Sequence, residues 1–271
     1  MADKICLRRM DDMHVHLRNN FDGENMLDLV LPFTTQCCSR AVVMPNLRPR
    51  PILNHRDVMW YRKQIKDSHK KMGNNPFEPL MVIEIRDTTT PAIIEKAKGV
   101  GVVAGKVYPL GVTTNSSAGL HDFFRPVIQD TFSKMQDVGM LLLLHGEIDL
   151  PNTLITKREE VFLPTLFWLA DTYPGLKIVL EHVSSKKGIE LVKRLGKNVA
   201  ATLTVHHACI TLNDAYCSPH NMCNPIPKDF EDRDAVLEAM MSGDPKFFLG
   251  SDSAPHQIHK KECAHIACGA F

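Results

Sequence analysis

The first residues able to do chemistry are two histidines separated by a single residue. His14 and His16 lie in the stretch DMHVHLR at residues 12–18. In an extended chain, side chains two positions apart point to the same face, so these two imidazoles converge on one point. Paired imidazoles are typical metal ligands. When only two histidines support such a site, local hydrogen bonding is the competing interpretation. The pair therefore needs support from other residues.

Similar donors follow three other short apolar runs. His145 follows residues 140–144, His182 follows residues 176–180 and one glutamate, and Asp252 follows residues 247–249. If these runs are parallel strands, the donors lie at the same end of the sheet. Local hydrogen bonding explains each residue taken alone, but agreement at four strand ends favours a shared site. Imidazole nitrogens and a carboxylate suit Zn²⁺, so the sequence predicts a zinc site.

A lysine lies inside a further apolar run. Lys106 belongs to residues 102–107 and is expected to point toward the same end of the sheet. One interpretation is a structural lysine that reaches water or pairs with an acid. The other is that burial and neighbouring cations lower its pKa and leave a neutral, nucleophilic amine. Such an amine captures CO₂, and the two oxygens of the resulting carbamate can bridge two metal ions.

The elements that must position these residues alternate along the chain, as in βα units around a parallel sheet. The predicted strands are residues 5–7, 41–44, 80–85, 102–107, 140–144, 176–180, 199–203 and 247–249. The predicted helices are residues 24–37, 54–68, 90–97, 123–137, 157–171, 186–195 and 232–241. Eight parallel strands favour an α/β fold of the (β/α)₈ TIM barrel type. An open doubly wound sheet is the alternative, but the chain contains neither GxGxxG nor a P-loop.

Seven helices for eight strands leave the barrel one helix short. The 271 residues contain no linker or internal repeat, so we predict a single barrel domain over residues 1–271. This domain is expected to be C-terminally incomplete, with the final helix missing after the eighth strand. Without that helix, the outer apolar faces of the first and eighth strands would be exposed. An exposed apolar face as large as one side of a helix predicts poor solubility, or a partner subunit that covers it.

The overall composition bears on which classes of partner the protein binds and on where in the cell it is found. Lys and Arg number 32 against 31 Asp and Glu, so the net charge of +1 attracts neither nucleic acid nor an anionic membrane. No apolar run reaches the length of a membrane span, and the first residues lack the apolar core of a signal peptide. We therefore expect a cytoplasmic protein whose eight cysteines are thiols.

Several motifs together resemble the class II dihydroorotases of the amidohydrolase superfamily. They are DMHVHLR at 12–18, VMPNL at 43–47, KVYP at 106–109, TTNSS at 113–117, LHGE at 144–147, LEH at 180–182 and GSDSAPH at 250–256. Their order and spacing match along essentially the whole chain. The stretch ATLTVHH at residues 201–207 further resembles the fungal branch of that family.

The resemblance implies a site with two Zn²⁺ ions bridged by hydroxide and by carboxylated Lys106. The implied metal ligands are His14, His16, Lys106, His145, His182 and Asp252. The first two histidines, the lysine and the aspartate would hold the more buried ion, and the carbamate and the other histidines the second. Asp252 would also act as the general acid and base.

The resemblance also implies how the substrate is bound. Arg18, Asn46 and His256 match the positions that bind the α-carboxylate of the substrate, and Thr113 and Thr114 match a mobile lid loop. The implied reaction is the reversible closure of N-carbamoyl-L-aspartate to L-dihydroorotate, a step of pyrimidine biosynthesis. A carboxylated substrate needs the arginine, because a guanidinium binds a carboxylate through two parallel hydrogen bonds.

Other interpretations stay open. The competing enzyme is another cyclic-amide hydrolase, such as a hydantoinase or allantoinase, which uses the same metals on a different ring. The non-enzymatic alternative is an inactive truncated homologue that serves as an assembly partner. A homodimer is also compatible with the sequence. Two positions depart from the family pattern: Asn224 stands where relatives often have an apolar residue before proline, and Cys268 lies near a substrate-contact position in a loosely matching region. The histidines predicted to lie in loops without a role are His206, His207, His220, His259 and His265.

Overall fold

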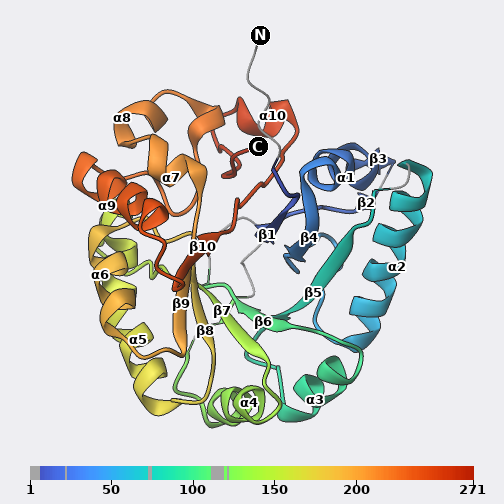
Figure 1. The fold of residues 1–271 in the computed structure, drawn as a ribbon, viewed down its shortest axis with the longest axis horizontal. Coiled ribbons are helices and arrows are strands. Elements are labelled where there is room, and N and C mark those ends of the chain that lie inside the picture. The colour runs from blue at the N-terminus through green and yellow to red at the C-terminus, as the bar shows by residue number, and fades with distance from the viewer. Residues whose placement is uncertain (1–6, 22, 73–74, 111–118, 121) are drawn as a thin grey trace.

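Eight parallel strands form the centre of the protein, with helices arranged around them (Figure 1). The computed structural model describes residues 7–21, 23–72, 75–110, 119–120 and 122–271. In sheet order the strands are β1 (Met10–Val15), β4 (Cys38–Val43), β5 (Glu78–Ile85), β6 (Ala104–Val107), β7 (Leu141–His145), β8 (Ile178–Glu181), β9 (Val199–Leu203) and β10 (Phe247–Leu249). The predicted (β/α)₈ TIM barrel is confirmed.

Helices connect successive strands, as a parallel sheet requires. They are α1 (Met26–Cys37), α2 (His55–Met72), α3 (Pro91–Gly99), α4 (Pro126–Asp137), α5 (Arg158–Thr172), α6 (Lys186–Arg194) and α9 (Phe230–Met241). Each of the seven helices predicted from amphipathic patterns corresponds to a different one of these helices. A two-stranded hairpin of β2 (Asn20–Phe21) and β3 (Glu24–Asn25) precedes α1, so the first predicted helix begins two residues too early.

Two apolar layers hold the barrel together because adjacent strand residues point to opposite faces. Val43, Ile83 and Leu144 are buried between the strands and the surrounding helices. Val42 and Leu143 pack with four other buried side chains in a separate, smaller cluster. Polar residues occupy the ends of several strands beyond this second cluster, and these carry the site.

The barrel closes through residues just beyond β10. Ser253 forms a bridge with Val15 at the end of β1, the His16 amide donates to the Ser253 carbonyl at 2.9 Å, and the Asp252 amide donates to the His14 carbonyl at 3.0 Å. These backbone bonds connect the first and last strands at the end that carries the predicted metal ligands. The carboxylate of Asp12 adds a further connection, accepting from the amides of His14 and Ser251 at 3.1 and 2.9 Å.

The predicted position of the first strand is wrong. The apolar run at residues 5–7 was the expected strand, but Leu7 is exposed and lies outside any strand, and residues 5 and 6 lie outside the described residues. The strand that pairs with β4 is Met10–Val15, through pairs such as Asp12 with Ala41. Its buried positions include Asp12 and His14, so counting apolar residues does not find it.

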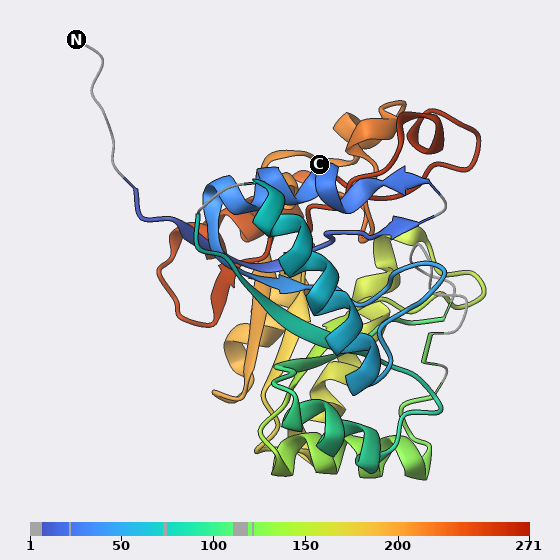
Figure 2. The same cartoon turned by 90° about the vertical axis from the view of Figure 1, so that its right-hand side faces the viewer.

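The segment after β10 contains little regular structure. Among the residues described there, the helix is α10 (Ile258–Lys261), which has four residues. Beside β10 and β1 lies a groove lined by residues that include Met10, Met13 and Phe248. The chain ends with Phe271, whose ring contacts Phe33 of α1 at a centroid distance of 5.4 Å, and Figure 2 shows this end beside α1. That the domain is C-terminally incomplete, and the poor solubility expected from this, both stay predictions.

The segment between β9 and α9 is more regular than its composition indicates. It contains α7 (Val205–Cys209), α8 (Leu212–Ala215) and the 3₁₀ turn η2 (Pro219–Asn221), and another 3₁₀ turn, η1 (Ile155–Lys157), precedes α5. His206 and His207 therefore lie on a helix, and their predicted loop position is wrong. Among the described residues, no helix is long and apolar enough to cross a membrane.

Candidate active site

Three of the predicted ligands meet where β1 and β10 come together. The Oδ1 atom of Asp252 lies 3.2 Å from Nε2 of His14 and 3.2 Å from Nε2 of His16, and the two imidazole nitrogens are 3.3 Å apart. All three side chains are buried. The sequence spacing of the two histidines therefore does bring both rings to one point, and a carboxylate oxygen faces them there.

A second pair of ligands lies beside the first group. Nδ1 of His145, at the end of β7, is 3.2 Å from Nε2 of His182, which follows β8. The rings of His182 and His14 have centroids 5.2 Å apart, so the two groups adjoin. The structure thus brings together the donors that the sequence placed at four strand ends.

Burial sets the charge of these groups. It lowers the pKa of His16 to about 3, and it holds the pKa of His14, His145 and His182 below the usual histidine value even though Asp252 is close. Burial alone would raise the pKa of Asp252, but His14, His16 and His182 hold it well below its usual value. The cluster therefore combines neutral imidazoles with an ionised carboxylate, which is the protonation state that metal binding requires.

Neighbouring side chains orient the imidazoles. Nδ1 of His16 donates to the Asn46 side-chain oxygen at 2.9 Å, which leaves the lone pair on Nε2, the atom that faces Asp252. Glu147 contacts Nε2 of His145 at 2.7 Å, and a Glu181 oxygen lies 3.0 Å from Nδ1 of His14. Metal-bound histidines usually have such a partner on the second ring nitrogen, because it fixes the tautomer and the ring orientation.

Lys106 lies on β6 and has no exposed surface. Its Nζ pairs with Glu181 and lies 5.1 Å from the centre of the Tyr108 ring. Burial lowers the pKa of Lys106 to about 7, against the opposing effect of Asp252. The position and the lowered pKa match the sequence-based hypothesis of an amine that is partly neutral at physiological pH.

The backbone at the site is held in an unusual conformation. Arg18, His182 and Asp252 have positive φ values of 61°, 41° and 49°. Side chains other than glycine rarely adopt this region, and such strain concentrates at functional sites where surrounding contacts enforce it. At His182 the enforcing contact is a 2.7 Å hydrogen bond from its amide to the hydroxyl of Thr202.

A cationic group lies next to the predicted metal ligands. Nη2 of Arg18 is 3.1 Å from Nε2 of His256, and its Nε donates to the Pro255 carbonyl at 3.0 Å. Burial lowers the pKa of His256 to about 4, so this imidazole is neutral at physiological pH and the positive charge belongs to Arg18. The cavity that joins both parts is lined by His14, His16, Arg18, Asn46, Tyr108, His145, His182, Asn224, Asp252, Ala254, His256, Cys268 and Gly269. Thr113 and Thr114 lie outside the described residues.

No family model matches the chain, but comparison with individual curated proteins identifies the family. A dihydroorotase of Nitrosomonas europaea is 40% identical over 275 residues, which cover 100% of this chain and 77% of that protein. A dihydroorotase of Teredinibacter turnerae is 42% identical with the same coverage. The chain belongs to the dihydroorotase family.

Solved structures agree with this dihydroorotase assignment. The dihydroorotase of Campylobacter jejuni superposes with a TM-score of 0.84 at 36% identity, covering 97% of this chain and 72% of that one. The Saccharomyces cerevisiae dihydroorotase, solved with 5-fluoroorotic acid, also gives 0.84 at 36% identity, covering 96% and 73%. An L-hydantoinase from Arthrobacter aurescens gives 0.78 at 17% identity and shares the fold alone. The two sequence relatives named above are bacterial, so the fungal branch stays a prediction.

Three buried residues of this dihydroorotase-family site carried no predicted role. Glu147 and Glu181 contact the predicted ligands, and Tyr108 lines the cavity beside Lys106. A signal for the two glutamates existed in the sequence, since each lies within two positions of a predicted histidine ligand. Cys268, expected near the substrate, does line the cavity, and its carbonyl lies 3.0 Å from Nε2 of His256.

Acid should destabilise the metal-free protein. Because burial lowers the pKa of His16 from 6.5 to about 3, the unfolded chain binds this proton first as the pH falls between those values. Above pH 6.5 the imidazole is neutral in both states and does not change the free energy of unfolding. Below pH 6.5 the free energy of unfolding decreases. This group alone removes on the order of 2 kcal/mol from the free energy of unfolding near pH 5. Urea titrations of the metal-free protein at neutral and acidic pH measure the loss. A His16→Gln variant with the same pH dependence would contradict this origin.

Proposed function

We propose that this chain catalyses the reversible closure of N-carbamoyl-L-aspartate to L-dihydroorotate with loss of water. The observation that carries the proposal is the combination of a convergent metal-ligand set with an adjacent Arg18 inside one cavity. The ligand set suits amide chemistry, and the arginine suits a substrate that carries a carboxylate. Family membership supports the same reaction.

The donor set fits two zinc ions. Neutral imidazole nitrogens and one ionised carboxylate are ligands that zinc prefers, and buried Nδ1 of His182 has no hydrogen-bond partner among the described residues. We infer that Lys106 serves both ions, with His14, His16 and Asp252 completing one site. His145 and His182 complete the other. When bound, zinc lowers the pKa of a coordinated water and polarises the amide carbonyl.

Lys106 is proposed to act as its carbamate. Its neutral amine attacks CO₂, a C–N bond forms, and the nitrogen gives up one proton. Glu181, which contacts Nζ in the structure, is the nearest acceptor for that proton. The product is an anion with two oxygens, which supplies a charge and a bridging geometry that a histidine cannot supply.

Asp252 is proposed to carry the proton of the reaction. In the ring-opening direction it accepts a proton from the attacking water and delivers it to the ring nitrogen as the amide bond breaks. In the ring-closing direction the same carboxylate removes a proton from the attacking nitrogen and delivers it to the oxygen that leaves as water. Its lowered pKa keeps it ionised, and its contacts with His14 and His16 fix its position.

Arg18, Asn46 and His256 are proposed to bind the α-carboxylate. Arg18→Lys should raise KM for dihydroorotate by about 10 to 100-fold with a smaller change in kcat, because an ammonium cannot reproduce two parallel charge-assisted hydrogen bonds. Initial rates of dihydroorotate hydrolysis measure both constants. Arg48→Lys, an exposed arginine on the wall of an adjacent cavity, is the matched control. An unchanged KM in Arg18→Lys would favour a substrate without this carboxylate, as in hydantoinases.

One experiment tests the function as a whole. The purified chain is assayed for dihydroorotate hydrolysis and for hydantoin hydrolysis, and its metal content is measured on the same sample. Turnover of dihydroorotate supports the proposal, whereas turnover of hydantoin alone would select the hydantoinase interpretation. Bound metal without either activity would select the inactive assembly partner. The lid role of Thr113 and Thr114, a homodimer and a cytoplasmic location stay predictions.

A further inference from the structure

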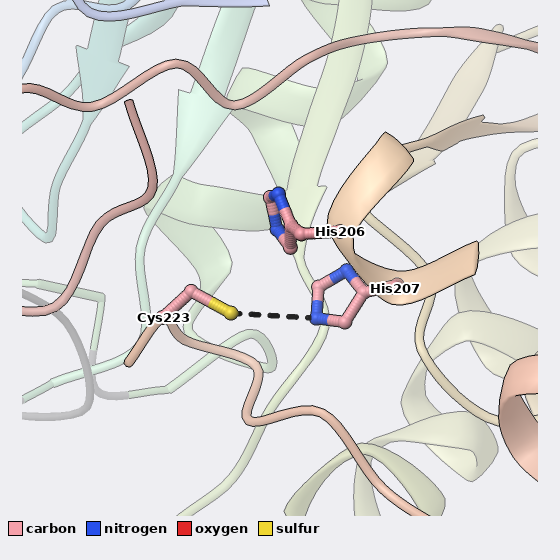
Figure 3. Close-up of side chains that lie close together, drawn as sticks. All are labelled: His206, His207 and Cys223. Carbon is pink, nitrogen blue, oxygen red and sulfur yellow. Dashed lines mark hydrogen bonds between the residues drawn. The ribbon is translucent and has the colours of Figure 1, made fainter. Parts of the chain in front are cut away.

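A second cluster of metal-binding side chains lies outside the proposed catalytic centre. His206 and His207 are neighbours on α7, and Cys223 comes from the segment that follows η2. Each of the three offers one ligand atom, and these atoms all lie within 4.8 Å of one another. Figure 3 shows the thiol of Cys223 and the two imidazole rings directed toward the same small region.

Contacts with Thr204 and Pro225 fix the positions of His207 and Cys223. Nδ1 of His207 is 2.8 Å from the hydroxyl of Thr204, and that hydroxyl also accepts from the His207 amide at 3.1 Å. Nε2 of His207 lies 3.8 Å from Sγ of Cys223. The Pro225 carbonyl oxygen accepts from Nε2 of His207 at 2.8 Å and from the Cys223 thiol at 3.3 Å. Nitrogen, sulfur and oxygen donors therefore surround one point.

His206 supplies the observation that local hydrogen bonding does not explain. Its Nε2 is buried and has no hydrogen-bond partner among the described residues. A buried polar atom without a partner costs free energy, and such atoms in native proteins require an explanation such as a bound ion. The His206 and His207 rings have centroids 4.5 Å apart, and a ring nitrogen of His206 lies within 4.8 Å of the ligand atoms of His207 and Cys223.

We propose that His206, His207 and Cys223 bind a further divalent zinc ion, with the Pro225 carbonyl as the fourth donor. Two imidazoles and a thiolate are a common zinc-binding set, and a tetrahedral ion accepts one oxygen in addition. This site is distinct from the proposed dinuclear centre, whose side-chain donors are nitrogen and oxygen.

The protonation states of the cluster suit this ion. Burial lowers the pKa of both histidines, so both imidazoles are neutral at physiological pH. Without an ion, Nε2 of His207 donates to the Pro225 carbonyl and Nδ1 accepts from the Thr204 hydroxyl. Binding would move the ring proton to Nδ1, next to Thr204, so that the lone pair of Nε2 faces the ion. Burial raises the pKa of the Cys223 thiol, which keeps its proton when no cation is present. Zinc forms the S–Zn bond as the S–H bond breaks, and the proton passes to solvent.

Binding at this site would connect α7 to a wall of the catalytic cavity. Cys223 directly precedes Asn224, which lines that cavity. An ion held by two α7 histidines and by this cysteine would fix the segment on which Asn224 lies. The site is therefore proposed to be structural, and it does not depend on which substrate the enzyme uses.

Titration of the metal-free protein with Co²⁺ tests the proposal. A thiolate ligand gives Co²⁺ a charge-transfer band in the near ultraviolet, whereas nitrogen and oxygen ligands give only weak visible bands. We expect the band to appear and to reach, at saturation, the intensity of one thiolate-bound Co²⁺ per chain, out of three Co²⁺ ions bound in total. Cys223→Ser should abolish the band and lower the total metal bound by one equivalent, while the visible bands of the dinuclear centre remain.

Two matched variants assign the thiolate. Cys268→Ser removes another nearby thiol, and Cys209→Ser removes an exposed thiol on α7, and both variants should keep the band.

His206→Gln, at a partly exposed position, should weaken Co²⁺ binding at this site and leave the fold unchanged by near-ultraviolet circular dichroism. Absence of the band at saturating Co²⁺, or its persistence in Cys223→Ser, would overturn the proposal. The band is independent of turnover, so failure of the proposed dihydroorotase activity would not affect this result.

Discussion

Asp252→Asn should lower kcat for dihydroorotate hydrolysis by about a thousandfold, within the range that general acid and base catalysis contributes. Asparagine keeps the size of the side chain and one oxygen near His14 and His16, but it cannot accept and return a proton. Because Lys106, His145 and His182 are unchanged, at least one metal ion should stay bound. Steady-state kinetics and metal analysis on the same preparation measure both effects.

Asp12 provides the matched control for this variant. It is also buried and acidic, and one of its oxygens accepts from the amides of His14 and Ser251. An asparagine oxygen can accept the same two hydrogen bonds, so Asp12→Asn should reduce kcat far less. If Asp252→Asn retains more than about a tenth of the original turnover, the carboxylate is not the proton carrier, since a general acid or base contributes about a hundredfold or more.

The sequence predicts the barrel well because its signals are local. Alternating apolar runs and amphipathic segments predict seven of the eight strands and all seven connecting helices near their observed positions. The exception is β1, where Asp12 and His14 occupy buried positions that apolar patterning does not detect. One of these two residues, His14, is also a predicted metal ligand, because a strand end that carries ligands gives up apolar side chains.

The site is predictable in part for a related reason. His145 is the last residue of β7 and His182 directly follows β8, so their shared location follows from the parallel topology alone. The partners of these residues depend on register: Glu181 lies opposite His145 across the β7–β8 pair, which brings it close to Lys106. The cluster of His206, His207 and Cys223 depends on the path of an irregular segment. Cys223 lies 16 positions from His207, and no periodic pattern connects them.

Two kinds of buried lysine can be compared in this chain. Lys228 is also almost fully buried, but it pairs with Ser184 and lies 3.8 Å from Glu159, neither of which is a predicted metal ligand. Lys106 pairs with Glu181, whose other oxygen approaches His14. The first arrangement is typical of a structural lysine. Removal of either side chain leaves a buried acid without its cation, so loss of activity alone does not separate a structural role from a bridging one.

Lys106→Ala should lower kcat by more than about a hundredfold, the upper range for losing a residue that merely orients a metal ligand. Short-chain carboxylates such as acetate or propionate should restore part of the activity in a saturable way, because a carboxylate has the charge and the two oxygens of the proposed carbamate. Lys228→Ala should show no such rescue at any carboxylate concentration, since no bridging anion is missing there. Rates measured against carboxylate concentration for both variants decide the matter. Undiminished activity in Lys106→Ala would exclude the bridge, and equal rescue of both variants would show that the added anion acts elsewhere.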